Sequence, residues 1–139
     1  MAGDATSARP VVVIADVANV MGSRPDGWWR NRAGAATALL AGMPRLVGSL
    51  VGGPDGDAVR IERVIAVLEG AAKKATGPDG IEVVRASADG DSTIVAVAED
   101  TQAAGARVVV VTADRGLRAR LDPDAIIAGP GWLNALLGR

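Results

Sequence analysis

Acidic residues follow four predicted strands of this 139-residue chain, each close to the point where a strand ends. They are Asp16, Glu69, Asp89, Asp91 and Asp114. Because the carboxyl ends of parallel strands meet at one edge of a sheet, we expect these side chains to share one neighbourhood. The segments that carry them lie far apart in the sequence, so the pattern predicts a site assembled by the fold.

Clustered carboxylates repel one another, which raises their pKa values unless a cation neutralises them. A site built from oxygen ligands alone suits a hard ion, so Mg²⁺ or Mn²⁺ is the expected cofactor. Such an ion, or a pair of them, can activate water and stabilise charge during phosphoryl displacement. The structural alternative is capping: Asp91 and Asp114 each precede a predicted helix, and Asp16 could cap a turn.

The composition excludes several kinds of chemistry. The chain has no cysteine, which removes disulfides, thiolate nucleophiles and zinc sites with cysteine ligands. It has no histidine either, which removes imidazole bases and Ser–His triads. The formal net charge of −1 gives no global basic field for nucleic acid, so phosphate contacts need a local arginine cluster. Catalysis here must therefore use carboxylates, hydroxyls, amides, Lys or Arg.

Alternating elements predict the fold that would position these residues. The predicted strands cover 11–15, 64–68 with an alternating lead-in from 59, 81–86, 107–111 and 125–128. The predicted helical segments cover 28–41, 44–51, 71–75, 91–104, 114–121 and 131–137, and 16–27 is predicted to be a loop. This order indicates a three-layer α/β/α sandwich with a mostly parallel central sheet.

The chain is expected to form a single domain over 10–139 after a flexible N-terminal segment, 1–9. No run approaches the roughly 18 apolar residues of a membrane helix, and the first residues do not resemble a secretory signal. We therefore expect a cytoplasmic protein without a membrane partner.

Three motifs resemble those of the PIN-like nuclease superfamily, which includes the NYN domains. They are DVANVMGSRPDGWW from Asp16, GDSTIV from Gly90 and VVVVTADRGLRARL from Val108. The resemblance implies a ribonuclease that binds a divalent metal through Asp16, Asp91 and Asp114 and cleaves RNA. It also assigns Asn19 to the polar position after the first aspartate.

The chain departs from this family pattern at two positions. Close relatives have WWRD where this chain has Asn31, and GDD where it has Ser92. Each substitution removes a carboxylate near the predicted site, and Asp89 is the candidate to replace one as a metal ligand. Two alternatives therefore stay open: a catalytically weakened module that binds RNA or nucleotides, and a metal-dependent nucleotide pyrophosphohydrolase or phosphatase.

Several further residues are expected around the acidic site. Guanidinium groups suit phosphate contact, and adjacent aromatic rings can stack on bases. The arginines assigned to substrate contact are Arg24, Arg30, Arg32 and Arg115, and the polar residues assigned to support are Asn19, Asn31, Glu69, Ser92 and Thr112.

Other charged and aromatic residues are interpreted differently. Arg118 and Arg120 are interpreted as a solvated helix face. Of Trp28 and Trp29, at least one is expected to belong to the core or an interface. The sequence leaves open a homodimer and an inhibitory protein partner, which toxin members of the superfamily have.

Overall fold

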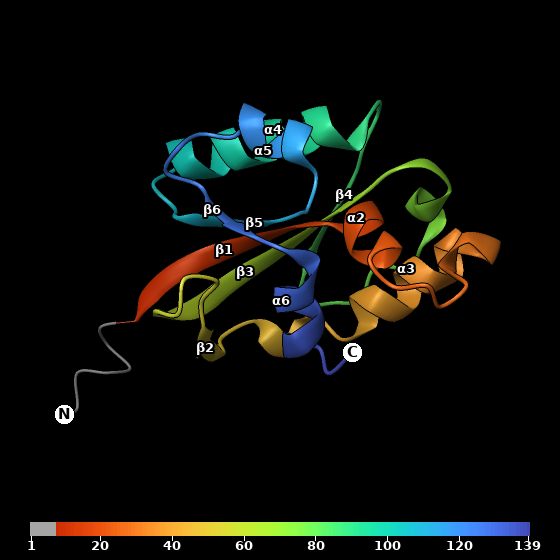
Figure 1. Ribbon diagram of the computed structural model, residues 1–139, viewed down its shortest axis with the longest axis horizontal. Coiled ribbons are helices and arrows are strands. Elements are labelled where there is room, and N and C mark those ends of the chain that lie inside the picture. Colours follow the sequence, from red (N-terminus) through yellow and green to blue (C-terminus); the bar gives the residue numbers. More distant parts are fainter. Residues whose placement is uncertain (1–7) are drawn as a thin grey trace.

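The central strand of the sheet is β1 (Arg9–Asp16), a valine-rich segment that is buried on both faces. In this computed structural model, which describes residues 8–139, β1 pairs in parallel with β3 (Ala58–Leu68) and β5 (Val108–Val111). Next to β5 lies β6 (Ile126–Ala128), and β4 (Glu82–Arg85) runs parallel to the second half of β3. All these strands therefore end at the same edge of the sheet (Figure 1).

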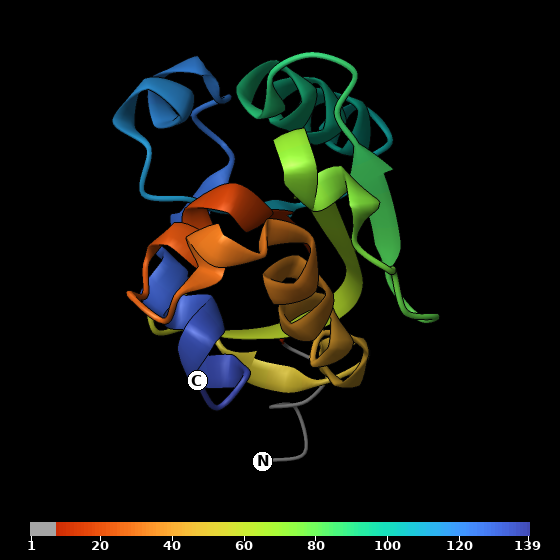
Figure 2. The ribbon, with the colours of Figure 1, turned by 90° about the vertical axis from the view of Figure 1, so that its right-hand side faces the viewer.

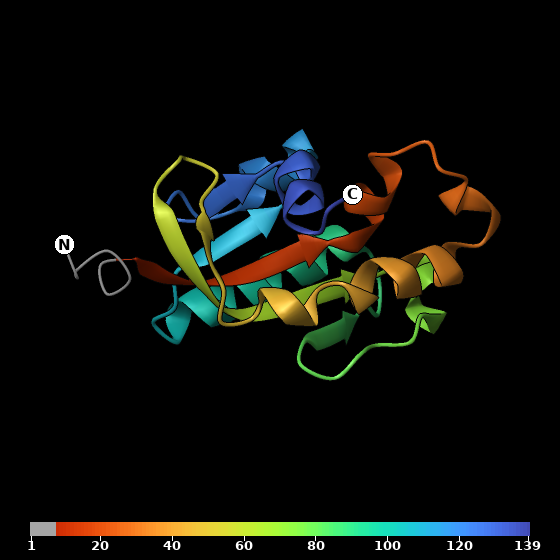
Figure 3. The same ribbon diagram turned by 90° about the horizontal axis from the view of Figure 1, so that it is seen from below.

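The exception is β2 (Leu50–Gly52), which pairs in antiparallel fashion with the start of β3. A tight turn joins the two strands, with the amide of Gly53 donating to the carbonyl of Asp57 at 2.7 Å. The sheet is thus curled and mostly parallel, and its antiparallel hairpin lies at the edge (Figure 3).

Alternate residues of β1 point into two separate cores. Val13 and Ala15 belong to the larger core, which contains residues of α2 (Val17–Gly22), α3 (Arg32–Ala41) and α6 (Pro130–Leu136). Val12 and Ile14 belong to the smaller core, under α4 (Gly90–Ala103) and α5 (Arg115–Arg120). Figure 1 shows these two groups of helices on opposite sides of the sheet. The remaining helical turns are η1 (Trp28–Arg30), η2 (Pro44–Leu46) and η3 (Gly70–Lys74).

The predicted mixed α/β class and mostly parallel sheet are confirmed, but two local predictions were wrong. The predicted loop 16–27 contains α2, because Asp16 caps this helix and Val17 and Val20 bury its apolar side. The predicted helix 44–51 is only one turn, η2, and its last residues form β2, since hairpin pairing with β3 outweighs local helical preference.

The boundaries of two other elements also differ from the prediction. The helix predicted over 28–41 is divided by Asn31, which ends η1 and caps α3. At the N-terminus, β1 already includes Arg9, which pairs with Val59, so the predicted flexible segment 1–9 overlaps this strand. Residues 1–7 lie outside the described part of the chain. In residues 8–139, no helix is long and apolar enough to cross a membrane.

Candidate active site

Asp16 lies at the end of the central strand and is only 7% exposed. One carboxylate oxygen accepts a hydrogen bond from the Thr112 hydroxyl at 2.9 Å, and the other accepts one from the backbone amide of Asn19 at 3.3 Å. Burial raises the pKa of Asp16 to about 6, and the charges of Glu69 and Asp91 add to that increase. The two hydrogen bonds oppose this shift without cancelling it.

Thr112 connects the ends of β1 and β5. Its side chain is fully buried, and its hydroxyl donates to Asp16 while accepting from the backbone amide of Asp114 at 3.1 Å. Nearby, the Asn19 side-chain oxygen accepts from the amide of Ala113 at 2.7 Å. The segments that follow the two central strands are therefore held together by hydrogen bonds rather than by apolar contact alone.

Asp91 and Asp114 approach the same edge from two helices. Asp114 caps α5 by accepting from the Leu117 amide at 3.0 Å, whereas Asp91 lies in the first turn of α4 and is not its cap. Burial raises the pKa of Asp91, and the charges of Asp114, Glu69 and Asp89 raise it further. These carboxylates are therefore close enough for their charges to interact.

Glu69 brings a fourth carboxylate to this edge of the sheet, directly after β3. Its carboxylate accepts a hydrogen bond from the amide of Gly90 at 2.6 Å, which joins β3 to the start of α4. We use the term acidic edge for Asp16, Glu69, Asp91 and Asp114. None of the ion pairs found within residues 8–139 includes a member of this set. Arg120 is the cation that lowers the pKa of Asp91, and it does not offset the raising effects.

The oxygen atoms of the acidic edge are suitable ligands for a divalent cation, but the side chains are not arranged around one. This edge offers carboxylate oxygens that form no ion pair within residues 8–139, and such oxygens are the ligands that Mg²⁺ and Mn²⁺ take. Yet within the described residues no group of three such side chains is arranged to hold one ion. Convergence at one edge is observed; a formed ligand shell is not.

Asp89 and Ser92, also predicted for the site, interact mainly with each other. Asp89 caps α4 by accepting from the Ser92 amide at 2.7 Å, and its second oxygen accepts from the Ser92 hydroxyl at 3.1 Å. These bonds, led by the one from the Ser92 amide, lower the pKa of Asp89. The residue that caps α4 is thus Asp89, and the helix begins at Gly90 rather than at the predicted Asp91. The Asp91 carboxylate therefore takes no part in the cap.

Two arginines that the sequence analysis placed on a solvated helix face make specific contacts. The Arg118 guanidinium donates to the carbonyl of Thr112 at 2.8 and 3.2 Å, and Arg120 donates to the Ser92 hydroxyl at 3.2 Å. The first contact reaches back six residues, from α5 to the residue after β5, a separation that no helix-face spacing indicates. No local pattern indicates the second one, because it crosses from α5 to α4.

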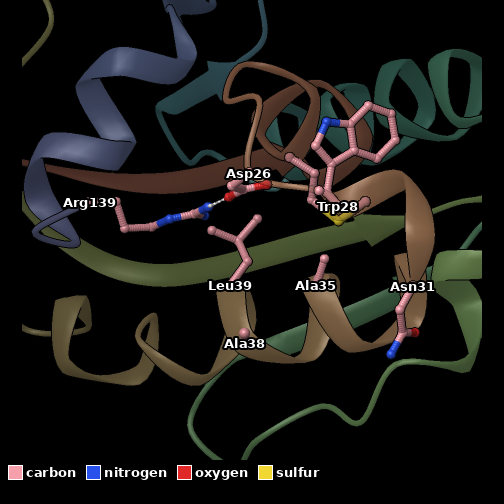
Figure 4. Close-up of a pocket in the computed structure, with 9 residues that line it drawn as sticks. Asp26, Trp28, Asn31, Ala35, Ala38, Leu39 and Arg139 are labelled. Atoms are coloured by element: carbon pink, nitrogen blue, oxygen red, sulfur yellow. Dashed lines mark hydrogen bonds and ion pairs between the residues drawn. The ribbon is translucent and has the colours of Figure 1, made fainter.

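The other predicted residues lie outside this hydrogen-bond network. Asn31 caps α3 by accepting from the Gly34 amide at 2.9 Å and lines a separate pocket of about 470 Å³ (Figure 4). Arg24 and Arg115 are exposed. The guanidinium groups of Arg30 and Arg32 lie over the rings of Trp29 and Trp28, respectively. Their roles in substrate contact stay predictions.

Gly90 is the glycine on which the position of Glu69 depends. A Cβ atom built at this position would overlap the Glu69 carboxylate, so Gly90→Ala is expected to displace that side chain and break its bond to the Gly90 amide. Alanine suits a helix better than glycine, so α4 should remain stable. Thermal unfolding would be measured together with cleavage of RNA, the activity that the resemblance implies; we expect reduced cleavage with little change in stability. Gly131→Ala is the matched control, since the start of α6 leaves open space there. Equal activity in both variants would contradict a role for Glu69.

Comparisons with known proteins support the fold. No protein-family model matches the sequence, and a search of curated proteins finds no match. Four chains among the solved structures match. One is a crystal structure of a mutant of Rae1 (YacP) from Bacillus subtilis, with a TM-score of 0.70 and 18% identity. The alignment covers 92% of this chain and 75% of that chain. At this identity the similarity shows a shared fold and nothing more specific.

Proposed function

We propose that this chain is a metal-dependent ribonuclease with a PIN-like three-layer α/β/α fold. The observation that carries the proposal is the acidic edge, where carboxylates from four distant segments come to one edge of the sheet and form no ion pair within residues 8–139. Burial and acidic neighbours raise the pKa values of Asp16 and Asp91. A cation is the natural means of neutralising such a set. RNA as the substrate class comes from the resemblance of the three motifs to the superfamily.

Mg²⁺ or Mn²⁺ would be held by Asp16, Asp91 and Asp114, with Glu69 beside them. When bound, the ion would supply water activation and charge stabilisation for phosphoryl displacement. The caps and hydrogen bonds leave ligand capacity on these side chains. Asp114 uses one oxygen for Leu117, and Glu69 uses one for Gly90. The bonds from the Thr112 hydroxyl and the Asn19 backbone amide hold the Asp16 carboxylate in one orientation.

The absence of histidine restricts how a phosphodiester bond could be broken. No imidazole is available as a general base, so a carboxylate must accept the proton of the attacking water. In-line attack by that water breaks the bond from phosphorus to the 3′-oxygen, as the resemblance implies, and protonation of the departing oxygen leaves a 5′-phosphate and a 3′-hydroxyl. Attack by the RNA's own 2′-hydroxyl would instead leave a cyclic 2′,3′-phosphate.

The test incubates labelled RNA with the purified chain in Mn²⁺, in Mg²⁺ and in excess chelator, and then identifies the product ends. We expect cleavage with either metal, none with chelator, and 5′-phosphate ends. Cleavage that persists in chelator would contradict metal dependence, and cyclic 2′,3′-phosphate ends would contradict attack by water.

A module that binds RNA without cleaving it is the second candidate. Ser92 and Asn31, which stand where close relatives carry carboxylates, are both engaged in local hydrogen bonds and add no charge. Measuring RNA binding and mononucleotide turnover beside RNA cleavage distinguishes the candidates: RNA binding without turnover favours the module. Turnover of mononucleotides but not RNA would favour the pyrophosphohydrolase or phosphatase.

A further inference from the structure

A pocket of about 430 Å³ adjoins the acidic edge. It lies where α2, η1, α3 and η3 meet, at the end of the molecule that Figure 2 turns toward the viewer. Its lining includes Ala18, Met21, Trp28, Arg32, Glu69 and Ala88. Glu69 belongs both to this pocket and to the acidic edge, so a ligand in the pocket would lie beside the Glu69 carboxylate. The volume is in the range of roughly 300–1,000 Å³ that small-molecule sites have.

Trp28 forms an aromatic wall of this pocket. The residue is half-buried, packs against the larger core, and lies over Gly22, where an added Cβ would be 3.7 Å from the indole. The guanidinium of Arg32 lies 5.4 Å from the centroid of the Trp28 ring. Arg32 therefore occupies the position over this indole that a nucleobase would take, and it would have to move aside for the base.

The adjacent residue, Trp29, provides an internal comparison. It is 50% exposed, meets Trp28 edge-on at 5.9 Å, and has Arg30 over its own ring at 5.8 Å. The chain thus carries two arginine–tryptophan pairs of similar geometry. Of these two pairs, only Trp28 and Arg32 line the pocket beside the acidic edge.

The larger pocket in Figure 4 is a weaker candidate for a nucleobase. Trp28 also lines it, but its other walls are mainly Ala35, Ala38 and Leu39, and an ion pair between Arg139 and Asp26 at 3.4 Å lies across it. It contains no member of the acidic edge. A base held there would have no carboxylate of that edge beside it.

We propose that the pocket of Trp28, Arg32 and Glu69 binds one unpaired nucleobase of an RNA strand, next to the position where the strand would be cut; the cleavage part rests on the proposed function. The base stacks on Trp28, and Arg32 turns to the adjoining phosphate. One Glu69 oxygen is held by the Gly90 amide, and the second can accept a hydrogen bond from the base. A carboxylate acceptor favours bases with an exocyclic amino group over uracil.

The experiment measures binding of short unstructured RNA oligonucleotides, all-cytidine, all-adenosine and all-uridine, in excess chelator so that no turnover occurs. Trp28→Ala is expected to weaken binding roughly 5- to 150-fold, the effect of losing one base–aromatic stack. Trp29→Ala, the matched control, should leave affinity unchanged. Wild type should bind cytidine and adenosine oligonucleotides more tightly than uridine, and Glu69→Gln should reduce that preference.

Trp28→Leu guards against a folding defect, since it keeps an apolar side chain against the core while removing the aromatic face. Its thermal unfolding would be measured beside its affinity, and it should bind as weakly as Trp28→Ala. Equal losses in the Trp28 and Trp29 variants, undiminished binding in Trp28→Leu, or no binding by wild type would each overturn the pocket. Binding that depends on Trp28 in a chain without nuclease activity would uphold the pocket and reject only the proposed function.

Discussion

Asp114→Asn is expected to reduce metal-dependent RNA cleavage by about 100-fold or more, the usual loss when an acid–base or charge-stabilising carboxylate is removed. Asparagine caps a helix about as well as aspartate, so the bond to the Leu117 amide and the stability of α5 should survive. The change removes one negative charge from the acidic edge and hardly any volume. Cleavage rates with Mn²⁺ would be compared at equal concentrations of folded protein.

Asp79→Asn is the matched control for that variant. Asp79 is exposed and lies in the turn before β4, at the opposite edge of the sheet from the acidic residues. Its rate should equal that of wild type. If Asp114→Asn cleaves as fast as this control, Asp114 has no part in the reaction. If both variants retain RNA binding, a lost rate can be assigned to the chemical step.

Asp16→Asn is expected to increase the free energy of unfolding at pH values above 6. The folded-state pKa of Asp16 is raised from 3.8 to about 6, so folding binds a proton that the unfolded chain has already released in that interval. The contribution of this residue is therefore fully present below pH 3.8 and is lost as the pH rises through 6. A shift of this size corresponds to about 3 kcal/mol at neutral pH. Asparagine has no charge to desolvate, but its single side-chain oxygen can accept only one of the two bonds from Thr112 and Asn19, which offsets part of the gain.

Urea unfolding of both proteins across this pH range would measure the difference between them. The free energy of unfolding of wild type is subtracted from that of the variant at each pH. This step removes the contributions of Asp89 and Glu82, whose pKa values are lowered and which change stability with the opposite sign. Asp100→Asn, on the exposed side of α4, serves as the control and should show no such trend. Added Mn²⁺ should stabilise wild type more than the variant, since a ligand stabilises the state that binds it. If the difference in the free energy of unfolding does not vary with pH, the ionised Asp16 carboxylate does not destabilise the fold.

The increase in stability and the loss of activity are expected to coincide at Asp16. An ionised carboxylate with 7% exposure and acidic neighbours destabilises the fold, and the same property would attract a cation. The hydrogen bonds from Thr112 and Asn19 favour the charged carboxylate but do not offset the cost of burying it, because the pKa of Asp16 is still raised. We therefore interpret the charge at this position as serving function rather than folding.

The sequence by itself determined the main architecture and the neighbourhood of the acidic residues. Runs such as Val11–Ile14 and Val108–Val111 are apolar and β-branched throughout, which suits strands buried on both faces. Parallel pairing then requires their carboxyl ends to meet. That reasoning predicts one neighbourhood for Asp16, Glu69, Asp89, Asp91 and Asp114, and acidic neighbours help to raise the pKa values of Asp16 and Asp91.

Tertiary structure alone decided how those carboxylates are held. The bonds from Thr112 to Asp16, from Gly90 to Glu69 and from Arg120 to Ser92 join residues 96, 21 and 28 positions apart. No periodicity or local propensity encodes such a contact, because each depends on where two independently formed elements come to rest. The same reason applies to β2, whose strand conformation comes from β3, and to the pocket of Trp28, Arg32 and Glu69. Local sequence sets the elements and their ends; the packing of one element on another sets the geometry of the site.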